Sequence, residues 1–240
     1  MHDNENHSTL GWKVLIKFVA GSLAIFLVIY LSDPYQIHLE GVIQPKRIIE
    51  MAIEDITNTM IINSNEDALD NKSLRQVALT AFEIVQKFPD EVLPEQYLII
   101  SGALVFTQLL KQAVELSDLA LLYHLSFNEK RQLLENKAQA LSVLRKWDSA
   151  RSAYQSIIQL IKGHETYITD PEQLFSSYLS AYSDWISLEK QARQCETASN
   201  LFEEMTTAHW YRQIGHEKIS ELQFFIDAIA DSVSDACRAR

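Results

Sequence analysis

The chain has 240 residues, of which 47% are hydrophobic, 22% charged and 10% aromatic. This composition excludes a disordered chain and predicts one or two domains with a hydrophobic core. Only 6 glycines and 5 prolines occur, and because β-rich folds place these residues at their many turns, the scarcity favours an all-α fold. The formal net charge of -11 repels a phosphate backbone, so we expect no nucleic acid as a partner.

The first predicted element is a single transmembrane helix at residues 14–32. A helix of this length extends about 28 Å, close to the roughly 30 Å hydrocarbon core of a bilayer. Its one charged residue is Lys17, whose long side chain reaches the headgroups from the first turns of the helix. Trp12 and Tyr30 lie near the two ends, as interfacial aromatic residues do. A cleavable signal peptide and a buried core helix are the alternative interpretations.

The charges on either side of this segment predict its orientation. Lys13 and Lys17 stand before or at the start of the span, whereas Asp33 and Glu40 follow it. Because cytoplasmic flanks carry the excess of lysine and arginine, the N-terminal tail, residues 1–13, is expected in the cytoplasm. The remainder of the chain would then be periplasmic or otherwise exported.

An oxidising compartment would act on the two cysteines, Cys195 and Cys237. They would be able to form a disulfide bond there. Two unpaired buried thiols fit the sequence equally well, since free cysteine is commonly buried.

Residues 33–45 are predicted to form an extended linker. Tyr35, Ile37 and Leu39 alternate with polar residues, and a period of two is typical of extended chain. After the linker the apolar residues recur at intervals of three and four, which predicts a helical domain over residues 46–240.

Punctuating residues divide this domain into nine predicted helices. Pro89 ends one helix and Pro94 starts the next, because proline lacks a backbone donor but suits a first turn. Ser126 and Glu129 have the spacing of a capping box. Asp170 precedes a proline and is expected to cap another helix. The predicted helices cover residues 48–60, 71–88, 94–110, 116–125, 127–144, 150–163, 171–191, 196–211 and 217–239.

One segment, KAQALSVLRKWDSARSAYQSIIQL at residues 137–160, resembles a unit of the tetratricopeptide repeat. Small residues stand where the two helices of such a hairpin cross, and aromatic residues stand in the second helix. Looser matches surround Ala78 and Ala198, while residues 97–125 fit no unit. The residues that carry the resemblance are Ala138, Leu141, Trp147, Ala150, Tyr154 and Ile157.

The resemblance implies a protein-binding scaffold whose first helices line a concave groove. A generic helical-hairpin bundle is the alternative, because alanine and aromatic residues at helical spacing are also ordinary core packing. If the resemblance holds, the groove residues are Gln132, Glu135, Gln139, Ser142, Ser180, Ser183 and Ser187.

No pattern of residues predicts a reaction. The 7 histidines include no pair at zinc-ligand spacing, and the sequence contains neither a phosphate-binding glycine loop nor a nucleophile elbow. The sequence therefore predicts no catalytic residue, no metal site and no cofactor.

These observations together predict a membrane-anchored helical scaffold or adaptor, an accessory or assembly subunit of an envelope membrane complex. Its partners would be other proteins of that complex and the bilayer itself through residues 14–32. One alternative is a structural subunit that packs through its membrane helix, where Gly21 allows close approach. The other is an envelope enzyme with a ligand pocket near Gly102 or among the tyrosines.

Overall fold

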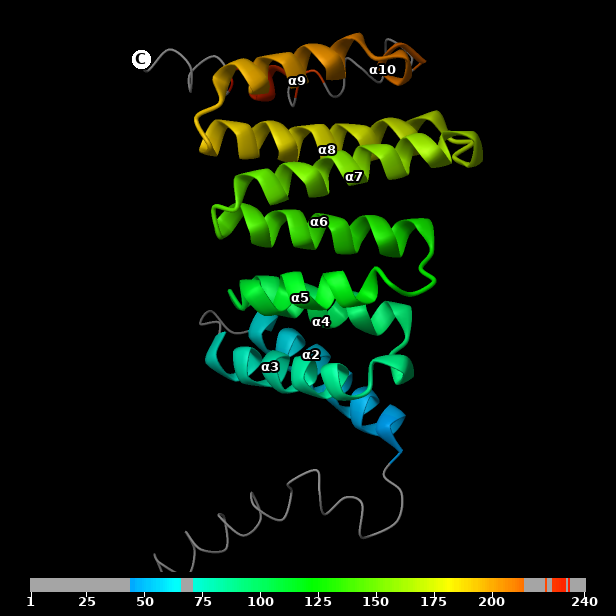
Figure 1. Cartoon of the computed structure of the whole chain (residues 1–240), viewed down its shortest axis with the longest axis vertical. Helices are drawn as coiled ribbons and strands as arrows, with labels where there is room; N and C mark the ends of the chain where they lie inside the picture. Colours follow the sequence, from blue (N-terminus) through cyan, green and yellow to red (C-terminus); the bar gives the residue numbers. More distant parts are fainter. Residues whose placement is uncertain (1–43, 66–70, 214–222, 224–225, 232, 234–240) are drawn as a thin grey trace, which may run out of the picture. The chain divides into compact units, whose positions relative to one another are not determined.

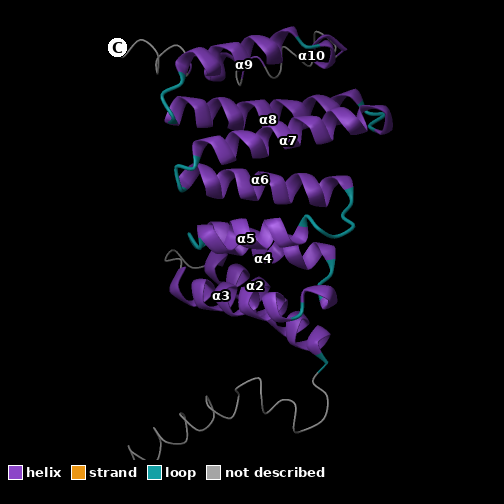
Figure 2. Cartoon of the chain, viewed as in Figure 1, coloured by secondary structure: helices purple, strands orange, loops and turns teal. Residues whose placement is uncertain are grey.

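The computed structural model of the protein describes residues 44–65, 71–213, 223, 226–231 and 233. The regular structure of these residues is helical and includes no strand (Figure 2), so the all-α prediction is confirmed for the described part of the chain. The predicted tail, membrane helix and most of the linker, residues 1–43, lie outside the described residues. Among the helices that are described, none combines the length and apolar character needed to cross a bilayer.

The chain divides into two compact units at Ile48. Of the first unit, the structure describes residues 44–48. They include the first turn of helix α2 (Pro45–Asn65). The sequence assigns Pro45 to the linker, whereas in the structure it is the first residue of the helix, a position that its fixed φ angle suits.

The second unit begins at Ile49. Its helices from α4 to α9 run in alternate directions, each packed against the next (Figure 1). Two short 3-10 helices, η1 (Pro89–Glu91) and η2 (Glu165–Tyr167), lie in the connections. The α-helices that follow α2 are α3 (Asn71–Lys87), α4 (Pro94–Phe106), α5 (Leu110–Ala120), α6 (Phe127–Val143), α7 (Trp147–His164), α8 (Pro171–Gln191), α9 (Cys195–Thr207) and α10 (His209–Gln213).

Several helix ends are set by the local signals in the sequence. The capping box is formed at the start of α6, where the Ser126 N–H donates to Glu129 Oε2 at 2.7 Å and the Glu129 N–H donates to Ser126 Oγ at 3.4 Å. At the start of α8 the Asp170 carboxylate accepts from the Glu172 N–H at 2.9 Å. Helix α3 ends just before Pro89. Side chains that satisfy the first amides of a helix therefore fix these boundaries.

Two predicted helices are interrupted. The predicted helix 94–110 ends at Phe106, and a new helix, α5, starts at Leu110 instead of residue 116. The predicted helix 196–211 is divided between α9 and α10 by the extended residue Ala208. In contrast, α7 continues through Gly163, which was expected to end it. The uncharged run across residues 97–110 concealed its turn, because apolar character does not distinguish helix from a buried turn.

The hairpins α4–α5, α6–α7 and α8–α9 contain the same turn. Gln108, Arg145 and Arg193 adopt φ angles of 61, 57 and 59°. In each turn the next residue donates its N–H to the carbonyl five residues earlier, at 2.8, 2.9 and 2.8 Å. This is a Schellman turn, whose left-handed residue is usually glycine. The three turns were hard to predict because none of them contains a glycine at this position.

A buried alanine occupies the same position after each of these turns. Ala113, Ala150 and Ala198 stand five residues beyond the left-handed residue, and all three are 0% exposed. A small side chain at this point lets the two helices of a hairpin approach closely. The counterpart of Ala150 in the preceding hairpin is therefore Ala113. Residues 97–125, which match no repeat unit in the sequence, include most of this hairpin.

Helix α6 contributes to both hydrophobic clusters of the second unit. Leu133 and Ala140 belong to the cluster built mainly from α2 to α5. Leu134, Ala138 and Leu141 belong to the cluster built mainly from α6 to α10. Because two faces of α6 are buried, its polar residues are confined to one remaining stripe. That stripe lines the candidate site.

Candidate functional site

A cavity of about 660 Å³ lies between α6 and α8, with Tyr154 of α7 in its lining. Helix α6 packs directly on α4 but makes few direct contacts with α8. The polar stripe of α6 is left uncovered by this gap. The cavity is lined by Asn128, Arg131, Gln132, Glu135, Asn136, Gln139, Ser142, Val143, Tyr154, Asp184, Ser187, Leu188 and Gln191.

Five of the seven predicted groove residues line the cavity. Ser180 and Ser183 are absent from its lining, although they share helix α8 with Ser187. The cavity instead follows the line from Asp184 to Gln191, nearer the C-terminal end of the helix. The predicted residues that do line it are Gln132, Glu135, Gln139, Ser142 and Ser187.

Sequence reasoning missed several lining residues for two different reasons. Asp184 and Gln191 lie three positions before and four positions after Ser187, so helical periodicity alone would have identified them. Tyr154 belongs to a second helix of a hairpin, and only the packing of α7 behind the cavity brings it there. Its side chain is 5% exposed and lines the groove.

Arg131 joins the two walls of the cavity. Its Nη1 donates to Ser177 Oγ on α8 at 3.0 Å. Its Nε lies 3.5 Å from Glu135 Oε1, yet this buried Nε has no hydrogen-bond acceptor in the described part of the chain. Arg131 therefore forms an ion pair with Glu135, but its Nε makes no hydrogen bond to that carboxylate.

Two carboxyl groups in the cavity have raised pKa values. Burial raises the pKa of Glu135, the Arg131 charge lowers it, and the Asp184 charge raises it. Burial also raises the pKa of Asp184. Glu135 on α6 and Asp184 on α8 carry charges of the same sign, which repel one another across the cavity.

Tyr154 supplies a hydrogen-bond donor to the same cavity. Its side chain is 5% exposed. Burial raises the pKa of Tyr154, and the charges of Asp184 and Glu135 raise it further. The phenol therefore stays protonated at neutral pH, and its O–H group remains a hydrogen-bond donor. The cavity consequently combines a donor, two carboxylates and several amide side chains that both donate and accept.

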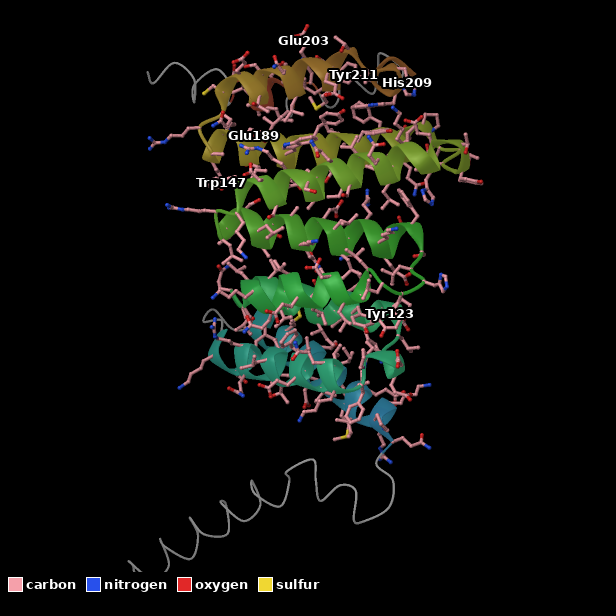
Figure 3. The ribbon with its side chains drawn as sticks, viewed as in Figure 1. Tyr123, Trp147, Glu189, Glu203, His209 and Tyr211 are labelled. Carbon is pink, nitrogen blue, oxygen red and sulfur yellow. The ribbon has the colours of Figure 1, made fainter. Side chains whose placement is uncertain are left out.

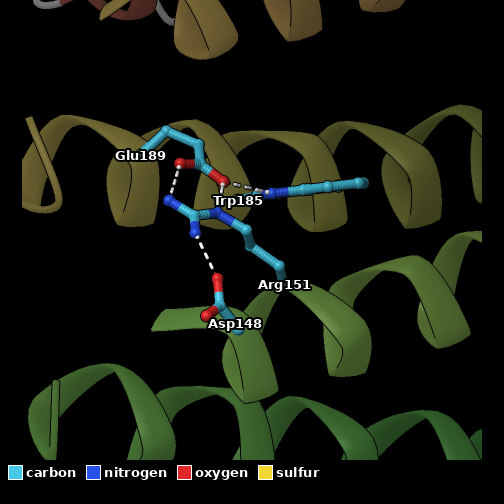
Figure 4. A network of polar contacts seen from close by, with 4 residues as sticks. All are labelled: Asp148, Arg151, Trp185 and Glu189. Carbon is cyan, nitrogen blue, oxygen red and sulfur yellow. Dashed lines mark hydrogen bonds and ion pairs between the residues drawn. The ribbon is translucent and has the colours of Figure 1, made fainter. Parts of the chain in front are cut away.

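Next to the C-terminal part of this wall, a buried ion pair joins α7 to α8 (Figure 4). Glu189 is 0% exposed, and its two oxygens accept from Arg151 Nε and Nη2, each at 2.8 Å. Trp185 Nε1 donates to the same carboxylate at 2.9 Å, and Arg151 Nη1 donates to Asp148 at 2.8 Å. This network fixes the part of α8 that carries Leu188 and Gln191 into the lining of the cavity.

A second recess, of about 690 Å³, lies against α2 and α4 and shares Gln132 with the first cavity. Its lining is mainly apolar and includes Leu98, Ile99 and Gly102. Apart from its chain neighbours and the backbone of its own helix, no described residue has an atom within 4 Å of the position that a Cβ at Gly102 would take. Helix packing therefore does not require glycine at this position.

Among the described residues, no group of three or more His, Cys, Asp or Glu side chains is placed to hold a metal ion. In comparisons with known proteins, no family model matches the chain, and no characterised protein shows significant similarity to it. The resemblance of residues 137–160 to a tetratricopeptide unit stays a prediction. The candidate site is thus defined by its own geometry, as a polar groove between the first helices of two hairpins.

Proposed function

We propose that the chain is a membrane-anchored helical scaffold that binds a segment of a partner protein in the cavity between α6 and α8. It would serve as an accessory or assembly subunit of an envelope membrane complex. The observation that carries this proposal is the convergence of polar side chains from α6, α7 and α8 on one open groove. Most of these polar side chains would be solvated equally well on an open surface, with the Tyr154 phenol as the exception. Solvation therefore does not explain why they line one groove.

The length of the groove supports an extended segment as the ligand. Its lining on α6 runs from Asn128 to Val143, a distance of about 22 Å at 1.5 Å per residue. An extended chain rises about 3.3 Å per residue, so six or seven residues fit along it. Gln132 and Gln139 are exposed in the groove, and amide side chains can pair with both the N–H and C=O groups of a peptide backbone.

A disulfide bond supports the exported location. Cys195, at the start of α9, is disulfide-bonded; Cys237 lies outside the described residues. Disulfides persist in oxidising compartments and are rare in the cytosol. This bond agrees with a domain that lies beyond the predicted membrane segment, residues 14–32.

Site-specific photo-crosslinking tests the proposed groove. A photoreactive residue at position 139 of the full chain, expressed in its native membrane, should capture a partner protein. The same residue at position 203 should not capture that partner, because Glu203 lies on α9 on the side away from α8 (Figure 3).

A matched pair of variants completes this experiment. Ser187→Trp should abolish capture at position 139, since a bulky ring would fill the groove. Ser180→Trp should preserve capture, because Ser180 is exposed on the same helix but lies outside the cavity lining. Equal capture from positions 139 and 203, or capture that survives Ser187→Trp, would contradict the proposed groove.

An enzyme pocket is the second candidate, and the raised pKa values of Glu135 and Asp184 favour it. Perturbed carboxyl groups in a cavity are also a property of catalytic sites. The crosslinking experiment separates the two functions. Under the enzyme hypothesis, Ser187→Trp would leave the set of captured proteins unchanged.

A further inference from the structure

The charge in the groove is unbalanced. Glu135 and Asp184 face the cavity from opposite walls, whereas Arg131 is the one basic side chain in its lining. Arg131 Nη1 is directed to Ser177, and its Nε is 3.5 Å from Glu135 without a hydrogen bond. No lysine, arginine or histidine of the described residues forms an ion pair with Asp184. The groove therefore keeps an excess of negative charge, with Glu135 half-buried on one wall and Asp184 exposed on the other.

We propose that the bound segment is extended and places a lysine or arginine side chain between Glu135 and Asp184. This inference rests on the proposed function and names the chemistry of its partner. A cation at this point would be attracted by both carboxylates, and the Tyr154 hydroxyl could donate to a neighbouring carbonyl of the segment. The amides at Gln132 and Gln139 lie on the same face of α6, three and four residues from Glu135.

The donor set favours a side chain over a metal ion as the cation. The cavity lining contributes two carboxylates and no histidine or cysteine, whereas Ca²⁺ takes six to eight oxygen ligands and Zn²⁺ is usually held by three or four protein groups. A lysine or arginine needs fewer partners. Its long apolar stem can also pack along Val143 of α6 and Leu188 of α8, which line the cavity.

Peptide binding to the full chain in detergent tests the inference. The probes are four pools of fluorescent octapeptides, randomised except for a central lysine, arginine, norleucine or glutamate. Fluorescence anisotropy should show the lysine and arginine pools binding at least about tenfold more tightly than the norleucine pool, the scale of a hydrogen-bonded charge pair. The glutamate pool should bind most weakly.

Variants assign the preference to the two carboxylates. Asp184→Asn and Glu135→Gln should each reduce the preference for lysine over norleucine, and the double variant should remove it. Glu203→Gln, an exposed neutralisation on α9, should leave the preference unchanged. Asp184→Lys should shift the preference towards the glutamate pool. Circular dichroism of each variant verifies that the helical fold is retained.

The outcomes separate the inference from the proposed function. Pools that bind in the groove without a preference for a basic residue would overturn the inference alone. The same holds if the preference survives in the double variant. Binding of no pool at all would overturn both the inference and the proposal that the groove takes an extended segment.

Discussion

Asp184 and Glu135 are placed where their ionised forms are disfavoured. Burial is the largest cause of the raised pKa of each carboxyl group. A folded-state pKa above the unfolded value means that, between these two pH values, the folded state binds more protons than the unfolded chain. Folding stability therefore falls as the pH rises through this window. At neutral pH both charges oppose folding, a cost typical of residues kept for binding.

Neutralising either carboxyl group should consequently stabilise the protein at pH 7. We expect Asp184→Asn and Glu135→Gln each to raise the free energy of unfolding by on the order of 0.5 kcal/mol, a small value because solvent screens both groups. The gain should fade as the pH is lowered below about 4, where the wild-type carboxyls become protonated in the unfolded chain as well as in the folded state. Urea titrations at several pH values measure it.

Glu203→Gln provides the control for these titrations, because Glu203 is exposed on α9. It should show no stability gain that depends on pH. A lower stability of Asp184→Asn at pH 7 would mean that the Asp184 carboxylate makes favourable contacts in the folded chain, against the charge imbalance described for the groove.

At the scale of the helices, Glu189 departs from the pattern of the other hairpins. Four residues before the left-handed residue, the first two hairpins have Leu104 and Leu141, which are 0% and 2% exposed. The third hairpin has Glu189 at the same position, equally buried. Its carboxylate is paired with Arg151, and this pairing raises the arginine pKa. A buried ion pair between α7 and α8 thus stands at a position where the first two hairpins have a buried leucine.

Breaking this pair from one side should cost more than removing it entirely. Arg151→Met leaves a buried carboxylate without its cation, and we expect it to lower the free energy of unfolding by about 3–5 kcal/mol. The double variant Arg151→Met with Glu189→Leu restores the leucine of the other hairpins. It should recover to within about 1 kcal/mol of the wild type or exceed it.

Equilibrium unfolding in urea compares the four proteins of this double-mutant cycle. If the double variant is no more stable than Arg151→Met alone, an unpaired buried charge is not the source of the loss. The loss would then come from packing of the arginine stem.

At the scale of the whole molecule, a membrane anchor would increase the occupancy of a groove that binds its partner with modest affinity. A domain tethered to the bilayer meets membrane partners at a high effective concentration. The predicted anchor, residues 14–32, is uncharged apart from Lys17. Moderate affinity for one short segment would then suffice for assembly at the membrane.

Extraction of membranes tests the anchor. The full chain should stay in the pellet after treatment with alkaline carbonate, whereas a chain that starts at residue 33 should be released. An apolar helix in the hydrocarbon core resists this treatment because its transfer to water is unfavourable. Release of the full chain would contradict the prediction of a membrane segment.

The disulfide bond has a separate test. In the chain retained in the membrane pellet, Cys195 should react with an alkylating reagent only after reduction.

Local chemistry made much of the helical content predictable. Capping at Ser126 and Asp170 and the proline at position 89 depend on contacts within a few residues, so their sequence signals are direct. The polar face of α6 was equally predictable, because helical periodicity alone places Gln132, Glu135 and Gln139 together.

The turns and the completed groove were decided by tertiary structure. Gln108, Arg145 and Arg193 occupy left-handed positions that carry no glycine, so packing of the paired helices had to impose them. Asp184 and Tyr154 meet Glu135 in one cavity only because α7 and α8 pack on the chain after α6. The sequence by itself determined most of the helical segments and which of their faces are polar, since these depend on neighbours three or four positions away. Which polar faces oppose one another depends on contacts between distant segments, and these only the packed fold decides.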